Sequence, residues 1–190
     1  YRELAASDPK THSLELASTL NNLGNRLAAA GRSAEALTAG IEAAEIFESI
    51  ERREPGRFLP LFALSLHNLA SRLREIGEQD RALVVMEWAA ERREALFEQE
   101  PERFRPALAT SLDGQGSLLI EMGQSARAQP LLARAAELWQ ELYHDQPDLY
   151  RADLARTLST LTPLRILGGE LEDAEDTASE AVKHYRALFA

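Results

Sequence analysis

The residues that could catalyse a reaction or hold a metal ion are scattered along this 190-residue chain. The four histidines, His12, His67, His144 and His184, stand in no metal-ligand spacing such as H-E-x-x-H. Cysteine is absent, so the chain offers neither a thiolate metal site nor a disulfide framework. We therefore expect no metal ion and no cofactor.

Two short stretches have the composition of ligand-binding loops. DGQGSLL at residues 113–119 contains two glycines, but no strand pattern precedes it, as a phosphate-cradling turn would require. GGELEDAED at 168–176 concentrates five carboxylates without the spacing of a calcium loop, and acidic residues are favourable in the first turn of a helix. Both stretches are better explained as helical segments, and we expect no enzymatic activity.

The stretch LNNLGNRLAAAGRSAEAL at residues 20–37 poses a different question. It places Gly24 inside an amphipathic helix pattern, where glycine costs about 1 kcal/mol relative to alanine. Asn21, Asn22 and Asn25 surround this glycine and could serve either the fold or a ligand.

An internal repeat with a period of 46 residues organises the whole chain. Two series of helix breakers share that spacing: Pro9, Pro55, Pro101 and Pro147, and Gly31, Gly77, Gly123 and Gly169. Alanines follow the same period at 17, 63, 109 and 155, at 36, 82, 128 and 174, and at 43, 89, 135 and 181. Repetition at this length is typical of arrays of helical units.

Each repeat is predicted to be a helical hairpin. In the second repeat the first helix spans roughly 58–76, with Pro60 in its first turn, and the second helix spans roughly 80–99. Ser33 and Ser125 stand where second helices should have their N-caps. A lone hairpin cannot bury the apolar stripes of both its helices, so the repeats should stack into an all-α solenoid.

The expected organisation is one continuous array. Its divisions are residues 1–9 as the end of a preceding second helix, 10–55, 56–101, 102–147 and 148–190 as repeats 1 to 4. The opening half-hairpin suggests a piece of a longer array.

The apolar spacing resembles the tetratricopeptide repeat (TPR). Leu20-x2-Leu23-Gly24-x2-Leu27, followed by Ala36-x3-Gly40-x2-Ala43, is similar to the pattern W-x2-L-G-x2-Y…A-x3-F. HEAT and armadillo repeats have periods nearer 46 residues but match this small-residue pair less well. Asn22 and Asn68 precede the leucine–glycine or leucine–alanine pair, which resembles the long repeats of kinesin light chains.

The resemblance implies a concave groove lined by the first helix of each repeat, which binds a protein or peptide. By the motif register the groove residues are Asn21, Asn22, Asn25, Leu64, His67, Asn68, Ser71, Arg74, Thr110, Asp113, Ser117 and Arg156. Asparagine amides suit the backbone of an extended peptide. Asn22 and Asn68 could equally tie neighbouring helices together, and the sequence leaves both readings open.

Several other residues are expected to be structural. Gly24 should let the first helix approach the second beneath Ala36, and Gly31 should end the first helix in a left-handed turn. Trp88 and Trp139 lie among apolar positions and should pack in the core or between repeats. Pro130 and Pro163 fall inside helices and should bend them.

Charge restricts the partners. The formal net charge of -10 is spread evenly over the repeats, with no basic stripe, which argues against nucleic acid and anionic membranes. We expect a non-catalytic scaffold for protein interaction within a larger signalling or regulatory protein. One alternative is a sensor or autoinhibitory array controlling a catalytic domain of the same chain, and another is a self-associating array. The alanine- and arginine-rich composition is typical of a GC-rich bacterial genome, and a cytoplasmic location is expected.

Overall fold

The computed structural model describes residues 9–189, which form α-helices joined by short turns. The helices are α2 (Pro9–Ala29), α3 (Ser33–Arg53), α4 (Leu59–Glu75), α5 (Gln79–Gln99), α6 (Pro101–Glu121), α7 (Ser125–Asp145), α8 (Pro147–Gly168) and α9 (Leu171–Leu188). The prediction that residues 1–9 end a preceding helix lies outside the described residues, except that Pro9 already begins α2.

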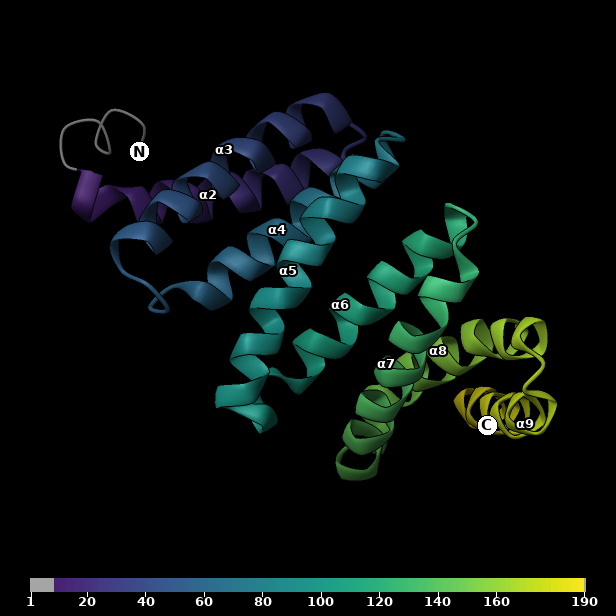
Figure 1. Ribbon diagram of the computed structural model, residues 1–190. Helices are drawn as coiled ribbons and strands as arrows, with labels where there is room; N and C mark the ends of the chain where they lie inside the picture. Colours follow the sequence, from purple (N-terminus) through teal and green to yellow (C-terminus); the bar gives the residue numbers. More distant parts are fainter. Residues whose placement is uncertain (1–8, 190) are drawn as a thin grey trace. The chain divides into compact units, whose positions relative to one another are not determined.

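The helices form two compact units. Unit 1 runs to Leu96 and contains α2, α3, α4 and most of α5, whereas unit 2 starts at Phe97 and contains α6 to α9. Within unit 1, α3 packs against both α2 and α4, and within unit 2, α7 packs against α6 and α8 while α9 packs against α8 (Figure 1). The described residues contain no strand, so the predicted all-α array of helical hairpins is confirmed.

Glycine turns close each hairpin in the same way. Gly31, Gly77, Gly123 and Gly169 have φ of 74°, 84°, 72° and 82°. Just beyond Gly31, the Arg32 N–H donates to the Leu27 carbonyl at 2.9 Å, and the Glu78 N–H donates to Leu73 likewise. These are Schellman closures, which need a left-handed residue and therefore favour glycine.

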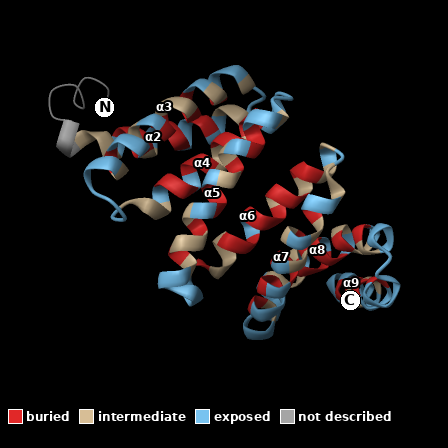
Figure 2. Ribbon diagram, in the orientation of Figure 1, coloured by how far each residue is buried: buried red, intermediate tan, exposed pale blue. Residues whose placement is uncertain are grey.

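The periodic alanines mark the closest helix contacts. Every alanine of the three 46-residue series retains at most 4% of its surface exposed, among them Ala17, Ala43 and Ala109 at 0%. Figure 2 shows buried residues concentrated where neighbouring helices of a unit face each other. Small side chains are required there because the helix axes approach closely.

The predicted helix caps are wrong. Ser33 and Ser125 are the first helical residues, and the cap positions belong to Arg32 and Gln124, neither of which makes a side-chain cap hydrogen bond. The chain enters each helix directly from the glycine turn, so the serine comes one residue too late. Pro130 and Pro163 lie inside α7 and α8, and helix continues on both sides of each.

Candidate binding surface

Asparagines of α2 and α4 bond to each other. Asn68 Nδ2 donates to Asn21 Oδ1 at 3.1 Å, and Asn21 is buried between the helices. The expectation that Asn21 faces an open groove is therefore wrong, because its amide joins two helices. The alternative in which Asn68 ties a neighbouring helix is the one that the structure shows, whereas Asn22 is exposed.

A buried arginine completes this interface. Arg72 on α4 is only 3% exposed, and its NH2 group donates to Asn25 Oδ1 at 2.7 Å and to the Asn21 carbonyl at 3.3 Å. Its Nε and NH1 atoms have no hydrogen-bond partner among the described residues. Burial lowers the pKa of Arg72, and the negative charge of Glu75 opposes that shift.

Two glycines make room for the Arg72 guanidinium. A Cβ added at Gly24 would lie 2.8 Å from NH2, and one added at Gly40 would lie 2.8 Å from NH1. The Gly24 Cβ would also lie 3.2 Å from the Ala36 carbonyl oxygen, so the predicted close approach to α3 is real. The sequence nevertheless missed the main occupant, which is a side chain 48 residues downstream.

Unit 2 fills the equivalent space with an apolar side chain. Gly116 lies two periods after Gly24, and its Cβ would meet Leu132 Cγ at 2.6 Å. Leu132 lies two periods after Gly40. A small residue on the first helix is thus common to both units, while the group that it accommodates differs.

Asp113 in unit 2 is also buried rather than open to a groove. Arg156 NH1 lies 2.5 Å from Asp113 Oδ2, and the Thr157 hydroxyl donates to Asp113 Oδ1 at 3.1 Å. Burial raises the pKa of Asp113, and the Arg156 charge and these hydrogen bonds oppose the shift. This ion pair joins α6 to α8, so Asp113 contributes to helix packing. The Arg156 side chain is half exposed, and that part of it is open to solvent.

His67 is held in the neutral form. Burial, reinforced by the positive charge of Arg93, lowers the pKa of His67 to about 4. Burial likewise lowers the pKa of Arg93 to about 10. The Nδ1 atom of His67 has no hydrogen-bond partner among residues 9–189, so it is an unused polar group on α4.

The remaining candidate residues lie at or near the surface of their units. Asn25, Leu64, Arg74 and Thr110 are exposed, and Ser71 and Ser117 are half-buried. The Ser71 hydroxyl donates to the His67 carbonyl at 3.1 Å, within α4. Trp139 is buried as expected, but Trp88 is 49% exposed, so it does not lie in the core; it lines a pocket with side chains of α3 and α4, which agrees with the alternative of packing between repeats. Sequence reasoning also missed Arg72 and Thr157, since nothing local distinguishes them from surface residues.

In the described part of the chain, no group of three or more histidines and carboxylates could hold a metal ion. Nor does any helix there have the length and apolar character needed to cross a membrane.

Paired antiparallel helices, glycine turns and alanine contacts at a 46-residue period define a helical-hairpin repeat protein. A family model described as tetratricopeptide repeat matches residues 16–50 and 62–102. Residues 16–50 and 62–102 therefore form repeats of the TPR type. No curated protein sequence matches it.

Solved structures share the fold at low sequence identity. RapI in its apo form matches with a TM-score of 0.74 and 17% identity, over 98% of this chain and 62% of RapI. Aspartyl phosphate phosphatase F from Bacillus subtilis matches with a TM-score of 0.71 and 15% identity, over 92% of this chain and 41% of the phosphatase. Putative kinesin light chain repeats from Podosopora anserina match with a TM-score of 0.52 and 15% identity, over 94% and 98%. The chain thus spans between two-fifths and two-thirds of the first two proteins.

Proposed function

We propose that this chain is a non-catalytic scaffold that binds a peptide or an extended partner segment along the exposed side of its first helices. These helices are α2 and α4 in unit 1 and α6 and α8 in unit 2, and we name their exposed side, taken within each unit by itself, the A-helix face. The TPR-type fold is generally used for protein–protein interaction. The larger protein would be a signalling or regulatory one.

The observation that carries the proposal is the network between α2 and α4. The Asn21–Asn68 and Asn25–Arg72 bonds hold the two helices in one register. A rigid polar surface loses little conformational entropy when it binds a flexible peptide. Asn22 is exposed beside this network and free to bond a peptide backbone with two donors and one acceptor.

Other side chains of the face supply complementary contacts. Leu64 exposes 42% of its surface on α4 and offers an apolar contact. Half-buried His67 is neutral, so a peptide that covers it buries no charge. Unit 2 carries a surface of its own on α6 and α8, with Thr110, Ser117 and the exposed part of Arg156, and Asp113 fixes the arginine from below.

A display selection followed by affinity measurement tests the proposal. Peptides selected on the wild-type chain are titrated by calorimetry against a variant carrying Asn22→Ala, Leu64→Ala and His67→Ala. The control variant carries Thr38→Ala and Ser49→Ala, two exposed positions of α3. We expect at least a tenfold weaker Kd for the first variant and an unchanged Kd for the control. Equal affinity of both variants would show that the A-helix face is not the binding surface.

The longer structural relatives favour a second candidate, a regulatory array within a larger chain. One of them is named an aspartyl phosphate phosphatase, of which this chain spans 41%. In this reading the array packs on a catalytic domain of its own full-length protein. Activity of the full-length protein should then rise when residues 9–189 are deleted, and unchanged activity would refute this candidate.

Self-association is a third candidate, supported by apolar side chains on α9. Val182 and Leu188 are 46% and 45% exposed, and Phe189 after the helix is 89% exposed. Light scattering at several concentrations should show a mass increase that Val182→Ser with Leu188→Ser abolishes. A concentration-independent monomer would exclude it.

A further inference from the structure

A groove on the other side of unit 1 lies between α3 and α5. Its floor is formed by Phe62, Leu66 and Leu69 of α4, and its apolar walls by Ile41, Val85 and Trp88. The cavity has a volume of about 240 Å³. We call it the α3–α5 groove, and it is distinct from the A-helix face because its floor is the buried side of α4.

Trp88 is the most exposed apolar residue of this groove. Nearly half of its surface meets solvent, whereas Phe62 beneath it is 4% exposed. A half-exposed indole over an apolar floor leaves a large area that a partner could remove from water. Tryptophan in such a position is also typical of residues that dominate binding energy at interfaces.

The repeat itself shows that the fold does not require this apolar wall. A shift of 92 residues takes the floor residues Leu66 and Leu69 to Leu158 and Leu161, which line the equivalent groove of unit 2. The same shift takes Val85 to Thr177 and Trp88 to Glu180.

The groove of unit 2 contains polar groups that bond to one another. Arg165 NH1 donates to the Asp173 carbonyl at 3.1 Å and also bonds the Thr177 hydroxyl. The two grooves therefore share a floor but not a surface chemistry. Because the fold forms in unit 2 without an apolar wall, the apolar wall in unit 1 is not needed for folding and is available for a binding role.

Charges at the rim indicate the partner. Glu45 and Glu48 line the α3 side; Glu48 pairs with Arg52 at 2.7 Å, but no bond or ion pair engages the exposed Glu45 carboxylate among the described residues. On the α5 side, the Arg92 guanidinium lies 5.0 Å above the Phe62 ring and donates to the Trp88 carbonyl.

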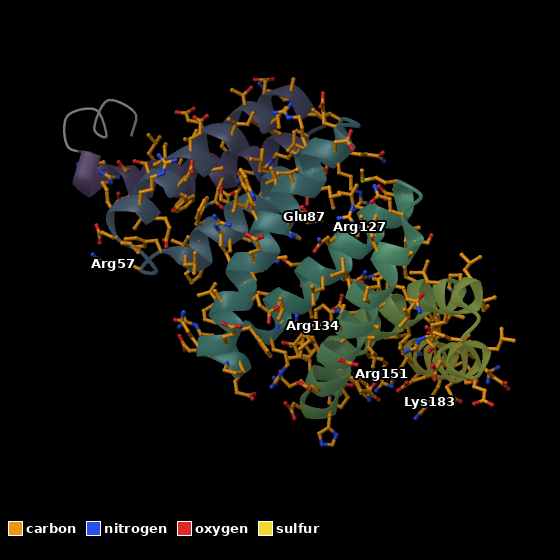
Figure 3. All side chains as sticks on the ribbon, viewed as in Figure 1. Arg57, Glu87, Arg127, Arg134, Arg151 and Lys183 are labelled. Atoms are coloured by element: carbon orange, nitrogen blue, oxygen red, sulfur yellow. The ribbon has the colours of Figure 1, made fainter. Side chains whose placement is uncertain are left out.

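A basic side chain elsewhere in unit 1 is already paired with an acidic one. Arg57, labelled in Figure 3, lies in the loop between α3 and α4 and pairs with Glu54. The open acidic position at Glu45, in a chain of net charge -10, favours a basic partner.

We infer that the α3–α5 groove binds an amphipathic helix of a partner protein, with an apolar side chain packed on Trp88 and a lysine or arginine paired with Glu45. Residues three or four apart on a helix lie on one face, so an apolar anchor and a basic residue one turn away can both reach the groove. Contact on Trp88 supplies affinity, and the Glu45 pair selects basic over acidic helices.

The probe is a fluorescein-labelled 18-residue helical peptide with leucine at i, i+3, i+4 and i+7 and lysine on its flanks. Matched peptides carry glutamate in place of lysine, or serine in place of leucine. Fluorescence anisotropy measures Kd for the wild type, Trp88→Ala, Glu45→Lys and the control Glu175→Lys, which makes the same charge change in unit 2. Circular dichroism confirms that each variant is folded.

We expect Trp88→Ala to weaken binding of the leucine–lysine peptide at least tenfold. Glu45→Lys should weaken it about threefold to tenfold and improve binding of the glutamate peptide, while Glu175→Lys leaves both unchanged. An unaffected Kd in Trp88→Ala would overturn the inference, as would an equal loss in Glu45→Lys and Glu175→Lys. A concentration-dependent dimer that Trp88→Ala abolishes would assign the groove to a second copy of the chain and overturn it too.

Discussion

The Arg72 guanidinium lies between Gly24 and Gly40. We therefore predict that Gly40→Ala changes the stability of the protein in opposite directions when Arg72 is present and when it is replaced by alanine. Gly40 lies inside α3, where alanine is favoured over glycine by about 1 kcal/mol. An added Cβ would lie 2.8 Å from Arg72 NH1, closer than side-chain packing allows. Gly40→Ala therefore brings a gain in helix propensity and a clash with a buried charged group.

The clash is the larger effect. To relieve it the guanidinium must move, and its 2.7 Å bond to Asn25 is weakened or lost. A hydrogen bond to a charged group contributes about 1.5–3 kcal/mol. Gly40→Ala should therefore destabilise the wild type by about 1 kcal/mol. In an Arg72→Ala background the space is empty, and the same change should stabilise by about 1 kcal/mol.

Urea unfolding of four proteins, followed by circular dichroism at 222 nm, measures this double-mutant cycle. The expected coupling between the two positions is about 2 kcal/mol. Similar stabilisation by Gly40→Ala in both backgrounds would refute the position of the guanidinium between the glycines.

Three other predictions concern buried groups. The folded-state pKa of His67 is about 4, below the usual value of 6.5, so its contribution to stability is full above pH 6.5 and is lost as the pH falls towards 4. Urea unfolding should therefore show that the free energy of unfolding falls by about 2 kcal/mol between pH 7.5 and 5, and that His67→Gln removes this loss. An equal dependence of the unfolding free energy on pH in the variant would contradict this. Arg156→Ala should destabilise the folded protein by about 2 kcal/mol because it leaves the buried Asp113 carboxylate without its ion pair. The loss of unfolding free energy should be smaller when Asp113→Asn is already present, and equal losses with and without Asp113→Asn would argue against the ion pair. Gly116→Ala should destabilise the folded protein by about 1–2 kcal/mol, because the added methyl group overpacks against Leu132. Thermal unfolding should show that Leu132→Ala restores part of this stability, whereas a stabilising effect of Gly116→Ala alone would contradict the packing.

Local chemistry determined much of the fold in advance. Helix ends could be predicted from Gly77 and Pro101 because each restricts the backbone of its own turn, and α4 and α5 end within a residue or two of the expected positions. The periodic alanines were also predictable, because every repeat makes the same close helix contact.

The polar interface could not be predicted because its partners come from different repeats and vary between them. Arg72 and Asn25 stand 47 residues apart, and at the equivalent place in unit 2 a leucine replaces the arginine. Burial decided the outcome for Asn21 and Asp113, whose residue types alone suggest solvent or ligand.

The sequence by itself thus determined the repeat, its helices and its turns, since these depend on backbone preferences and on a contact made four times. Only the tertiary structure decided which asparagines are bonded, where the arginine lies and that Trp88 is exposed, because each depends on side chains that folding brings together from distant positions.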